Sequence, residues 1–385
     1  MSISRNLTAA VALLILGLSC TPIRPAKLQR LPSAPGSIAL DSVQSGIVFE
    51  YAQHFPNGTQ LSICIIRGDS ERYAGIERRN DSLVCIDNAD SVFEVGSITK
   101  TFTGTMLAKM VYDGKVRLDE PIKNIIPVSL KQSQVNGREV ELVDLANHTS
   151  GLPFEPTNVK NDKRYPFDPY SPYRDYSTQR LYEYLSRDMV LNSMPGEKRL
   201  YSNLGGGLLG HALTLLSGRT YEGLLAESIC TPLGMQHTFV EADTERNGWI
   251  VRGRDPSGHL LPRDGDCGVL TGAGGIKSSA RDLAKYLRKN IADTTYFYLA
   301  QKSTKAFDEH FTGGLGWATY SESGKHHVGA FGATGGYSSG VIFERQERVG
   351  VVLLTNVSAF LLAEVNYTEK LCRALYDPLP YAPKR

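Results

Sequence analysis

Short apolar runs typical of β-strands occur near both ends of this chain, and helical patterns fill the long section between them. The runs cover residues 61–67, 73–79, 83–87, 337–343 and 349–355. Turn-forming pairs such as Gly68-Asp69 and Asn80-Asp81 separate the first three runs, as in antiparallel hairpins. Because an isolated strand cannot bury its apolar face, the two chain ends must meet. We therefore predict one antiparallel sheet that both ends complete.

The section between the strands has the periodicity of α-helices. Its first helical pattern begins at Ile98 and ends before Gly114, with Phe102, Met106 and Met110 among its apolar residues. Further helices are expected at 141–147, 178–187, 204–217, 221–229, 279–290 and 361–375. The predicted fold class is therefore α/β, of the α+β kind, with helices flanking the sheet and a mainly helical domain inserted into it.

These patterns divide one folded unit into two parts. The sheet-containing part is expected to comprise residues 43–95 together with 325–378, and the mainly helical part residues 96–324. At 385 residues the chain is long enough to bury a large core across both parts. The two parts are therefore expected to form a single functional unit.

The N-terminus has the features of an export signal. A basic residue precedes an apolar run at 9–18, which is too short to span a bilayer, and Cys20 follows a small residue. This arrangement resembles a bacterial lipoprotein cleavage site, although Gly17 stands where leucine is usual. We predict a signal peptide at 1–20, a lipid anchor at Cys20 and a tether at 21–42, which would attach an exported protein to a lipid bilayer of the bacterial cell envelope. Plain secretion is the alternative.

The composition excludes several partners and cofactors. The chain has 42 basic and 40 acidic residues and no basic stripe with interleaved aromatic residues, which argues against nucleic acid. Its five other cysteines are widely scattered, which argues against a disulfide framework and a metal site. Cys64 and Cys85 lie in neighbouring predicted strands and could pair, and buried free thiols are the alternative. No metal and no cofactor is implied.

Ser97 and Lys100 stand three residues apart at the start of the first helical pattern. This spacing places both side chains on one face of a helix, within hydrogen-bonding reach. A serine hydroxyl needs a base to attack an acyl group, and an amine that burial or positive potential keeps neutral can serve. Gly96 precedes the pair, so the hydroxyl is expected at a helix N-terminus, where developing negative charge is stabilised. The pair therefore predicts acyl transfer through a covalent serine ester.

About a hundred residues later, Tyr201 and Asn203 could complete a proton-transfer cluster with this pair. Ser97 is the only serine followed three residues later by lysine, and Tyr201 is the only tyrosine followed two residues later by asparagine. Either motif alone is common, because an isolated serine of this kind often caps a helix and an isolated tyrosine often lies in a loop. A catalytic interpretation of the two motifs therefore depends on the segments around them.

Those surroundings resemble the serine β-lactamase and penicillin-binding-protein superfamily, specifically its class C-like branch, over residues 60 to 360. The segments that carry the resemblance are FEVGSITK (93–100), LANHTSGLP (145–153), PGEKRLYSNLG (195–205), PLGM (232–235), GGIKSSARDL (274–283) and GLGW (314–317). They occur in the order and spacing of the family. The resemblance implies that Ser97 is the nucleophile and Lys100 its activating amine. It also implies that Tyr201 relays the proton and that Asn203 holds the lysine and the substrate.

The third motif departs from the family pattern. The family has histidine or lysine, any residue and glycine on a strand beside the nucleophile, and counting back from Gly336 gives Ala330-Phe331-Gly332. The cationic or imidazole position is therefore an alanine. Gly332 persists, and the backbone N–H of Ala333 is expected to be a second oxyanion donor beside that of Ser97. This departure favours ester or other acyl chemistry over β-lactamase or D-alanyl-peptidase activity.

We therefore predict a serine hydrolase that acts on small ester, amide or peptide substrates through an acyl-serine intermediate. An acyltransferase that uses an alcohol acceptor, and a D-alanyl peptidase or β-lactamase, are the alternatives. A non-catalytic sensor on the same fold is disfavoured because all four residues of the cluster are intact. The segment Gly336–Gly340 also fits the nucleophile elbow of α/β-hydrolases, but a strand-like run follows it and no histidine lies beyond His327.

Several further residues have two interpretations. Tyrosines cluster between the two main motifs, at positions 165, 170, 173, 176, 182 and 184. This segment is expected to be either a lid over an apolar substrate or an ordered surface loop. His148 and His211 are expected to be structural, and His326 and His327 to be exposed residues at the end of a strand.

Overall fold

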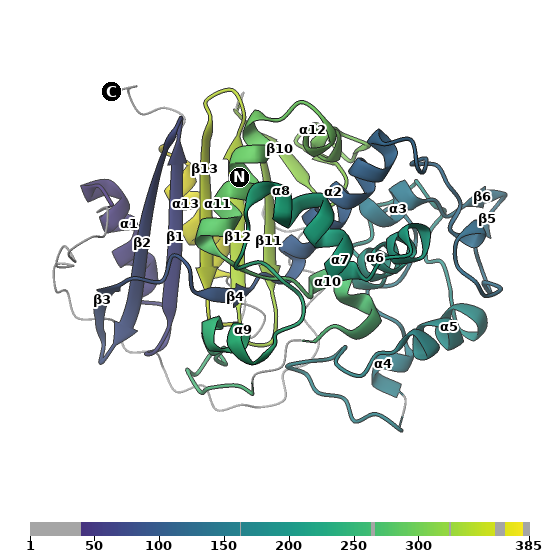
Figure 1. Ribbon diagram of the computed structural model, residues 1–385, viewed down its shortest axis with the longest axis horizontal. Coiled ribbons are helices and arrows are strands. Elements are labelled where there is room, and N and C mark those ends of the chain that lie inside the picture. The colour runs from purple at the N-terminus through teal and green to yellow at the C-terminus, as the bar shows by residue number, and fades with distance from the viewer. Residues whose placement is uncertain (1–39, 162, 263–265, 323–324, 359–365, 380–385) are drawn as a thin grey trace.

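The computed structural model describes residues 40–161, 163–262, 266–322, 325–358 and 366–379. Its largest element is an antiparallel sheet with the strand order β3-β2-β1-β13-β12-β11-β10-β9-β8 (Figure 1). The strands are β1 (Gln60–Arg67), β2 (Ser70–Arg79), β3 (Ser82–Ile86), β8 (Lys305–Ala306), β9 (Phe311–Gly313), β10 (Ala318–Glu322), β11 (Lys325–Ala333), β12 (Ser338–Glu344) and β13 (Val349–Thr355). The first strand pairs with the last, with Leu61 opposite Thr355 and Arg67 opposite Val349. The predicted sheet completed by both chain ends is confirmed.

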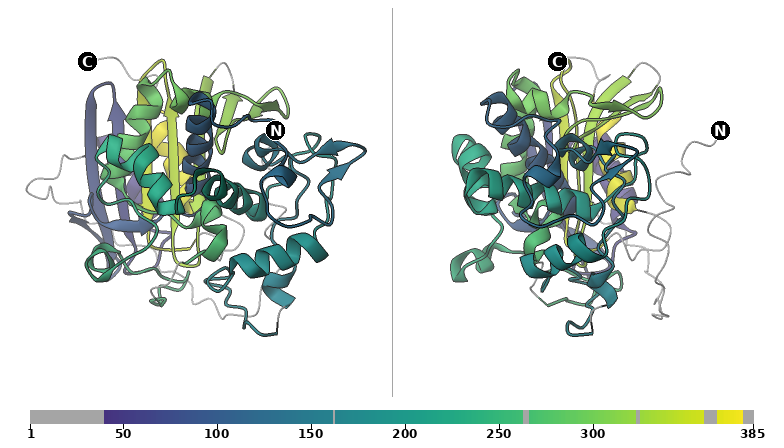
Figure 2. Two further views of the ribbon diagram at one scale, coloured as in Figure 1. Left: turned by 45° about the vertical axis from the view of Figure 1, so that its right-hand side comes forward. Right: turned by 90° about the vertical axis from the view of Figure 1, so that its right-hand side faces the viewer.

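Strands β1 and β13 lie at the centre of this sheet, which explains their continuous apolar runs. Every residue of β13 is buried. Val351 and Leu353 join the core beneath α1 (Ser42–Ala52) and α13 (Tyr367–Tyr376). Alternate residues of the same strand, such as Val352, join the core on the opposite face, which α11 (Ala280–Ala292) covers. Figures 1 and 2 show the sheet between these helices.

The helical part packs around α2 (Thr99–Tyr112), which contacts α6 (Asn203–Ser217), α10 (Thr271–Gly274) and α12 (Tyr296–Gln301). The other helices are α3 (Leu142–Ala146), α4 (Asn158–Asn161), α5 (Thr178–Arg187), α7 (Tyr221–Leu225), α8 (Thr231–Leu233) and α9 (Thr244–Trp249). Short 3₁₀ turns occur at Gly96–Ile98, Ile122–Asn124 and Gly268–Leu270, and a π-helical turn at Ala226–Cys230. Two small sheets pair β4 (Val92–Glu94) with β7 (Lys277–Ser279) and β5 (Gln134–Val135) with β6 (Arg138–Glu139). This part lies to one side of the sheet (Figure 1).

Several elements differ from the sequence predictions, and the short helices α4, α8, α9, α10 and α12 were not predicted. Strands β8–β10 belong to the main sheet although they precede residue 325, where the sheet-containing part was expected to resume. They are short and carry few apolar residues, so their pattern is weak. The helix expected at 221–229 ends at Leu225 and continues as the π-helical turn. Helix α1 was not predicted, although Asp41 and Gln44 form a capping box at its start.

The expectations for the N-terminus fall outside the described residues, which exclude the signal peptide at 1–20, Cys20 and most of the tether at 21–42. Within the described ranges, no helix is long and apolar enough to cross a membrane. Cys64 is a free thiol, so Cys64 and Cys85 do not form a disulfide with each other. Burial raises the pKa of the Cys64 thiol well above its ordinary value. The alternative of a buried free thiol therefore applies to Cys64.

Candidate active site

Ser97 lies on the 3₁₀ turn that leads directly into α2. Gly96 precedes it with a φ of +51°, a left-handed conformation that glycine adopts readily. A Cβ atom at Gly96 would also lie 2.6 Å from the backbone nitrogen of Ala333 on β11. The missing side chain therefore lets the serine turn approach β11 closely. Ser97 stands at the N-terminus of α2, as the sequence predicted.

Lys100 lies one helical turn after Ser97, and only 5% of its surface is exposed. Its Nζ donates to Ser97 Oγ at 3.1 Å, to Asn203 Oδ1 at 2.8 Å and to the carbonyl oxygen of Ala273 at 2.7 Å. These acceptors match the three N–H donors of an ammonium group. Gly206 on α6 makes room for the lysine stem, because a Cβ atom there would lie 3.0 Å from Lys100 Cε. The geometry therefore fits a charged lysine.

Tyr201 approaches Ser97 from the loop before α6. Its hydroxyl donates to Ser97 Oγ at 2.6 Å, and Lys100 Nζ lies 4.9 Å from the centre of its ring. Burial alone would raise the pKa of the Tyr201 phenol. The charge of Lys100 and the hydrogen bond with Ser97 outweigh burial, so this pKa lies below its ordinary value. Tyr201 is therefore suited to give up and take back a proton next to Ser97.

His148 holds the loop that carries Tyr201. Its ring lies 4.4 Å from the Tyr201 ring, and its Nδ1 accepts from the backbone N–H of Ser202 at 3.3 Å. Burial, reinforced by the charges of Arg199 and Lys100, holds the pKa of His148 well below its ordinary value. His148 also has a φ of +65°, which is unusual for a residue with a side chain and is often found at functional sites. The predicted structural role of His148 thus concerns the position of Tyr201.

Asn203 connects the cluster to the tyrosine-rich segment. Its Oδ1 accepts from Lys100, and its Nδ2 donates to the hydroxyl of Tyr173 at 3.1 Å. The Tyr173 hydroxyl in turn donates to Glu155 Oε2 at 3.3 Å. Burial and the Glu155 charge raise the pKa of Tyr173 well above its ordinary value, so it remains a neutral phenol. The sequence placed Tyr173 in a lid or surface loop and did not identify this contact.

Strand β11 lines the other side of Ser97. A Cβ atom at Gly332 would clash with the carbonyl oxygen of Val95 and lie 2.8 Å from the backbone nitrogen of Ser97. The backbone N–H of Thr334 donates to Tyr337. Because hydrogen-bonded pairs alternate in an antiparallel ladder, the Ala333–Ser338 pair is not hydrogen-bonded, and the Ala333 N–H points away from β12. The N–H groups of Ser97 and Ala333 are therefore the two candidate oxyanion donors.

Ala330 lies on the same face of β11 as Gly332, because the two residues are separated by one position. It packs against the core that contains α2, whereas Phe331 packs on the opposite face. The pairing of β10 with β11 extends only from Lys325 to Gly329. Ala330 to Ala333 thus contribute backbone and small side chains, and no ionisable group, to the serine side of β11.

The two histidines upstream of this stretch differ from each other. His326 is exposed, as expected, but His327 is half-buried between Tyr320 and Tyr376, so the expectation of exposure was wrong for His327. Burial lowers the pKa of His327 to about 4. Its position on β11 is odd-numbered like that of Phe331, so it faces away from Ser97.

The serine of the nucleophile-elbow pattern is part of the sheet. Ser338 begins β12, is buried, and donates to the carbonyl oxygen of Val357 at 2.8 Å. The residues directly after it continue as strand β12 and not as the helix that a nucleophile elbow requires. The structure therefore agrees that this pattern is coincidental.

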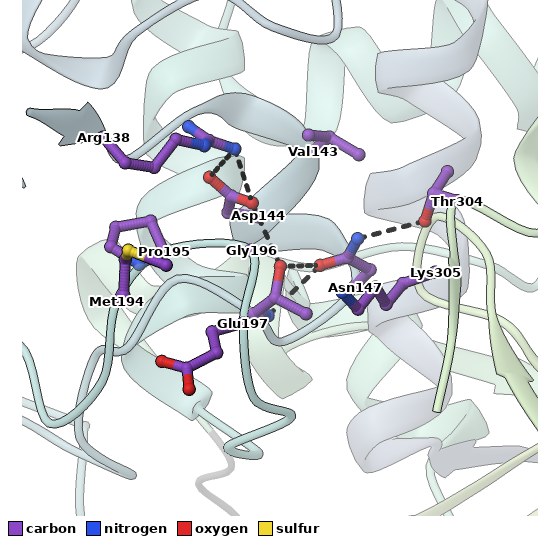
Figure 3. Close-up of a pocket in the computed structure, with 11 residues that line it drawn as sticks. Arg138, Val143, Asp144, Asn147, Met194, Pro195, Gly196, Glu197, Thr304 and Lys305 are labelled. Carbon is purple, nitrogen blue, oxygen red and sulfur yellow. Dashed lines mark hydrogen bonds and ion pairs between the residues drawn. The ribbon is translucent and has the colours of Figure 1, made fainter. Parts of the chain in front are cut away.

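A cavity of about 640 Å³ is lined by Asn147 and Thr149, the sequence neighbours of His148, and by residues around Pro195 (Figure 3). Its lining includes Asp144, which pairs with Arg138 at 3.0 Å and accepts from Thr149 Oγ1 at 3.0 Å. Asn147 donates to Thr304 at 3.1 Å across the same cavity. These polar groups are bonded to one another and brace the backbone on either side of His148. Within the described residues, no group of three histidine, cysteine or acidic side chains could hold a metal ion.

The sequence of the chain is similar to those of known proteins. The family model described as Beta-lactamase matches residues 61–369. The D-alanyl-D-alanine-carboxypeptidase/endopeptidase AmpH of Escherichia coli (strain K12) is 28% identical over 341 residues, which cover 83% of each chain. A Beta-lactamase of Pseudomonas fluorescens is 26% identical, over 68% of this chain and 69% of that protein.

Solved structures show the same fold. A beta-lactamase/D-alanine carboxypeptidase from Yersinia pestis superposes with a TM-score of 0.70 at 21% identity, over 89% of this chain and 99% of that one. An octameric penicillin-binding protein homologue from Pyrococcus abyssi superposes with a TM-score of 0.69 at 25% identity, over 87% and 77% of the two chains. The family match spans most of the chain and includes the whole Ser97 cluster. The chain therefore belongs to the β-lactamase family of serine hydrolases.

Proposed function

We propose that this protein hydrolyses small ester or amide substrates through an acyl intermediate on Ser97. The observation that carries the proposal is the convergence of Lys100 and Tyr201 on Ser97 Oγ, at 3.1 and 2.6 Å. A serine hydroxyl that contacts both a phenol and an ammonium can lose its proton as it attacks a carbonyl carbon. Ser97 is thus the nucleophile of the proposed reaction.

Tyr201 is the proposed base. Lys100 uses its three N–H groups as donors, so it serves best as a fixed positive charge and not as a proton acceptor. This charge stabilises the Tyr201 phenolate, which then accepts the Ser97 proton. The family resemblance implied that Lys100 is the amine that activates Ser97. In the mechanism proposed here, that role is electrostatic, and Asn203 and Ala273 hold Lys100 in place.

Backbone N–H groups are placed to stabilise the tetrahedral intermediate. As the Ser97 oxygen–carbon bond forms, negative charge moves to the former carbonyl oxygen, and the N–H groups of Ser97 and Ala333 are placed to bind it. The intermediate collapses when the leaving group departs with the proton that Tyr201 carries. A water molecule that gives its proton to Tyr201 then attacks the acyl carbon. When this second tetrahedral intermediate collapses, its bond to Ser97 Oγ breaks, Tyr201 returns the proton to that oxygen, and the acid is released.

The substrate is proposed by class. The names of the relatives denote peptidase and β-lactamase activities, which act on amide bonds. Ala330 removes a charged side chain from the strand beside Ser97, which favours substrates that do not depend on that group. A non-catalytic sensor is disfavoured, because the proton-transfer residues remain in contact with one another. Transfer of the acyl group to an alcohol in place of water needs only a different acceptor and remains the second candidate.

The location of the protein is also a proposal. The apolar run at 9–18, followed by Cys20, supports export and a lipid anchor on the cell envelope. Replacement of Cys20 by alanine should release an anchored protein from the membrane fraction. An unchanged membrane fraction would contradict the anchor, without bearing on the reaction.

A substrate panel tests the proposed reaction. Esters, β-lactams and D-Ala-D-Ala peptides would be incubated with the protein, with and without an alcohol, and the products identified by mass spectrometry. We expect turnover of at least one class by the wild type, and loss of turnover in Ser97→Ala. Ser186→Ala, at an exposed position on α5, is the control and should retain turnover. Equal product formation by Ser97→Ala would contradict the proposal, and an ester of the added alcohol would identify an acyltransferase.

A further inference from the structure

Arg199 stands two residues before Tyr201 and is half-buried. Within the part of the chain that the structure describes, its guanidinium makes no ion pair and no hydrogen bond. Its Cζ lies instead 4.9 Å from the ring centre of Phe311 and 5.9 Å from that of Phe307. A guanidinium carries five N–H donors, so those of Arg199 remain open to solvent or to a ligand. This arrangement leaves a cation available for an anionic ligand.

The surroundings of Arg199 strengthen this argument. Burial lowers the pKa of Arg199, and the nearby Tyr320 and Tyr201 oppose this effect only in part. Arg373, on α13, makes a useful contrast. It lies over Phe331 and Tyr320 at about the same distances, but it pairs with Glu369 at 2.9 Å. The two arginines thus share an aromatic environment, and only Arg373 has a carboxylate partner.

Arg199 lies close enough to the reaction centre to act there. Its positive charge contributes to the lowered pKa values of both Tyr201 and His148. Its neighbour Leu200 donates its backbone N–H to the carbonyl oxygen of His148 at 2.8 Å, which fixes the start of the Tyr201 loop. On the facing strand, Ala330 offers no charge. Among the described residues, Arg199 is therefore an unpaired cation close to the proton-transfer residues.

We propose that Arg199 binds a carboxylate group of the substrate beside Tyr201, and so determines specificity for anionic substrates. The inference rests on the proposed function, because it names the substrate class of the same site. The planar guanidinium can bind a carboxylate through two parallel hydrogen bonds, and the ring of Phe311 holds it in orientation. The ligand supplies the acceptor that Arg199 lacks in the protein.

Boronic acids test this proposal, because they bind whether or not the substrate is known. Phenylboronic acids with a carboxylate at the meta or para position would be compared with the matched carboxamides, and their dissociation constants measured by calorimetry. A serine oxygen adds to boron to give a tetrahedral boronate, and the serine proton passes to solvent. The proteins are the wild type, Ser97→Ala, Arg199→Gln, Arg199→Lys and the control Arg373→Gln.

We expect the wild type to bind the better carboxylate about ten- to hundredfold more tightly than its carboxamide. Arg199→Gln should lose this preference, Arg199→Lys should retain part of it, and Arg373→Gln should retain all of it. Absence of the preference in the wild type, or an equal loss of affinity for both compounds in Arg199→Gln, would overturn the role of Arg199. If Ser97→Ala bound both compounds as well as the wild type, the acyl-serine function would fail, and the carboxylate preference would still report on Arg199.

Discussion

The two sides of Ser97 are built in opposite ways. On the proton-transfer side, formed by Lys100, Tyr201 and Asn203, each side chain contacts another member of the cluster or Ser97. On the strand side, formed by Ala330 to Ala333, the residues near Ser97 offer backbone groups and small side chains. In the proposed mechanism, the first side moves protons and the second shapes the space for the carbonyl group.

This difference determines how strongly substitutions on each side should affect activity. Removing a charge from the proton-transfer side leaves buried acceptors without donors and disturbs every remaining contact. The strand side depends instead on the lack of side-chain atoms, so the chain tolerates alanine at position 330 without losing the machinery for acyl transfer. The expected effects of substitution therefore decrease from the first side to the second, and from the reacting groups outward.

The largest effect is expected for Lys100→Met on the proton-transfer side. Methionine fills similar space but removes the charge beside Tyr201 and leaves Asn203 Oδ1 and the Ala273 carbonyl without their donor. We expect kcat/KM to fall by about 10³-fold, measured with the best ester from the substrate panel. Lys109→Met on the exposed side of α2 is the control. Less than a tenfold loss in a folded Lys100→Met protein would contradict the charge-stabilising role.

The same substitution should change the pH dependence. The pKa of Tyr201 lies below its ordinary value chiefly because the charge of Lys100 outweighs the effect of burial. If ionised Tyr201 is the base, kcat/KM rises with pH until Tyr201 has lost its proton. Removing the positive charge raises the pKa of Tyr201, so the rising limb should move to higher pH in Lys100→Met. If the rising part of the pH profile of kcat/KM stays in place or moves to lower pH, the ionisation of Tyr201 is not its cause.

Gly332→Ala tests the strand side at its most crowded point. The new Cβ atom would clash with the Val95 carbonyl and push β11 away from the Ser97 N–H, whereas the matched Gly329→Ala meets only Val341 O at 3.1 Å. We expect Gly332→Ala to lower kcat by about 10²-fold, the typical effect of losing an oxyanion donor. Thermal unfolding would be measured in parallel. Equal kcat values for the two variants would show that this close approach is not needed.

A smaller effect is expected for Tyr173→Phe, at the outer end of the proton-transfer side. The change removes the hydroxyl that accepts from Asn203 Nδ2. Loss of one such hydrogen bond should reduce kcat/KM by about fivefold. Tyr176→Phe is the matched control, because the Tyr176 hydroxyl bonds to Asn158 in the same segment and not to the cluster. If both variants lost activity equally, the Tyr173 effect would be one of general loop stability.

The smallest effect is expected for Ala330→His on the strand side. An imidazole at this position adds a hydrogen-bonding group on the face that carries Gly332. Hydrolysis of β-lactams that carry a carboxylate should rise by about twofold, measured by loss of absorbance of the β-lactam. An unchanged rate in the folded variant would count against Ala330 as the third-motif position.

The sequence predicted the sheet, most helices and the residues of the Ser97 cluster, because each of these can be recognised from residue types or from their spacing. Ser97 lies on the 3₁₀ turn that continues directly into α2, where Lys100 lies, so their separation of three residues keeps the two side chains close. Other contacts of the cluster cannot be recognised from the sequence. The Ala273 acceptor is a backbone carbonyl, which any residue could provide. Tyr173 is one of several tyrosines in its segment, and only the tertiary fold selects which hydroxyl reaches Asn203.

The strands at the far edge of the sheet were also hard to predict. β8 and β9 have two and three residues and little apolar content, so the tertiary context stabilises them more than their own sequence does. Arg199 was visible in the sequence beside the tyrosine motif, but a lack of acceptors is a property of the fold. Sequence patterns thus reveal groups that act within one element, and the structure is needed for groups that meet across several.

The central claim is that Ser97 becomes acylated. The most direct test is the intact mass of the protein, quenched with acid within milliseconds of mixing with an ester substrate, followed by peptide mapping. We predict a mass increase of one acyl group in the wild type, located on the peptide that contains Ser97, and no increase in Ser97→Ala. An adduct on another residue, or rapid turnover of the ester by Ser97→Ala, would contradict the account.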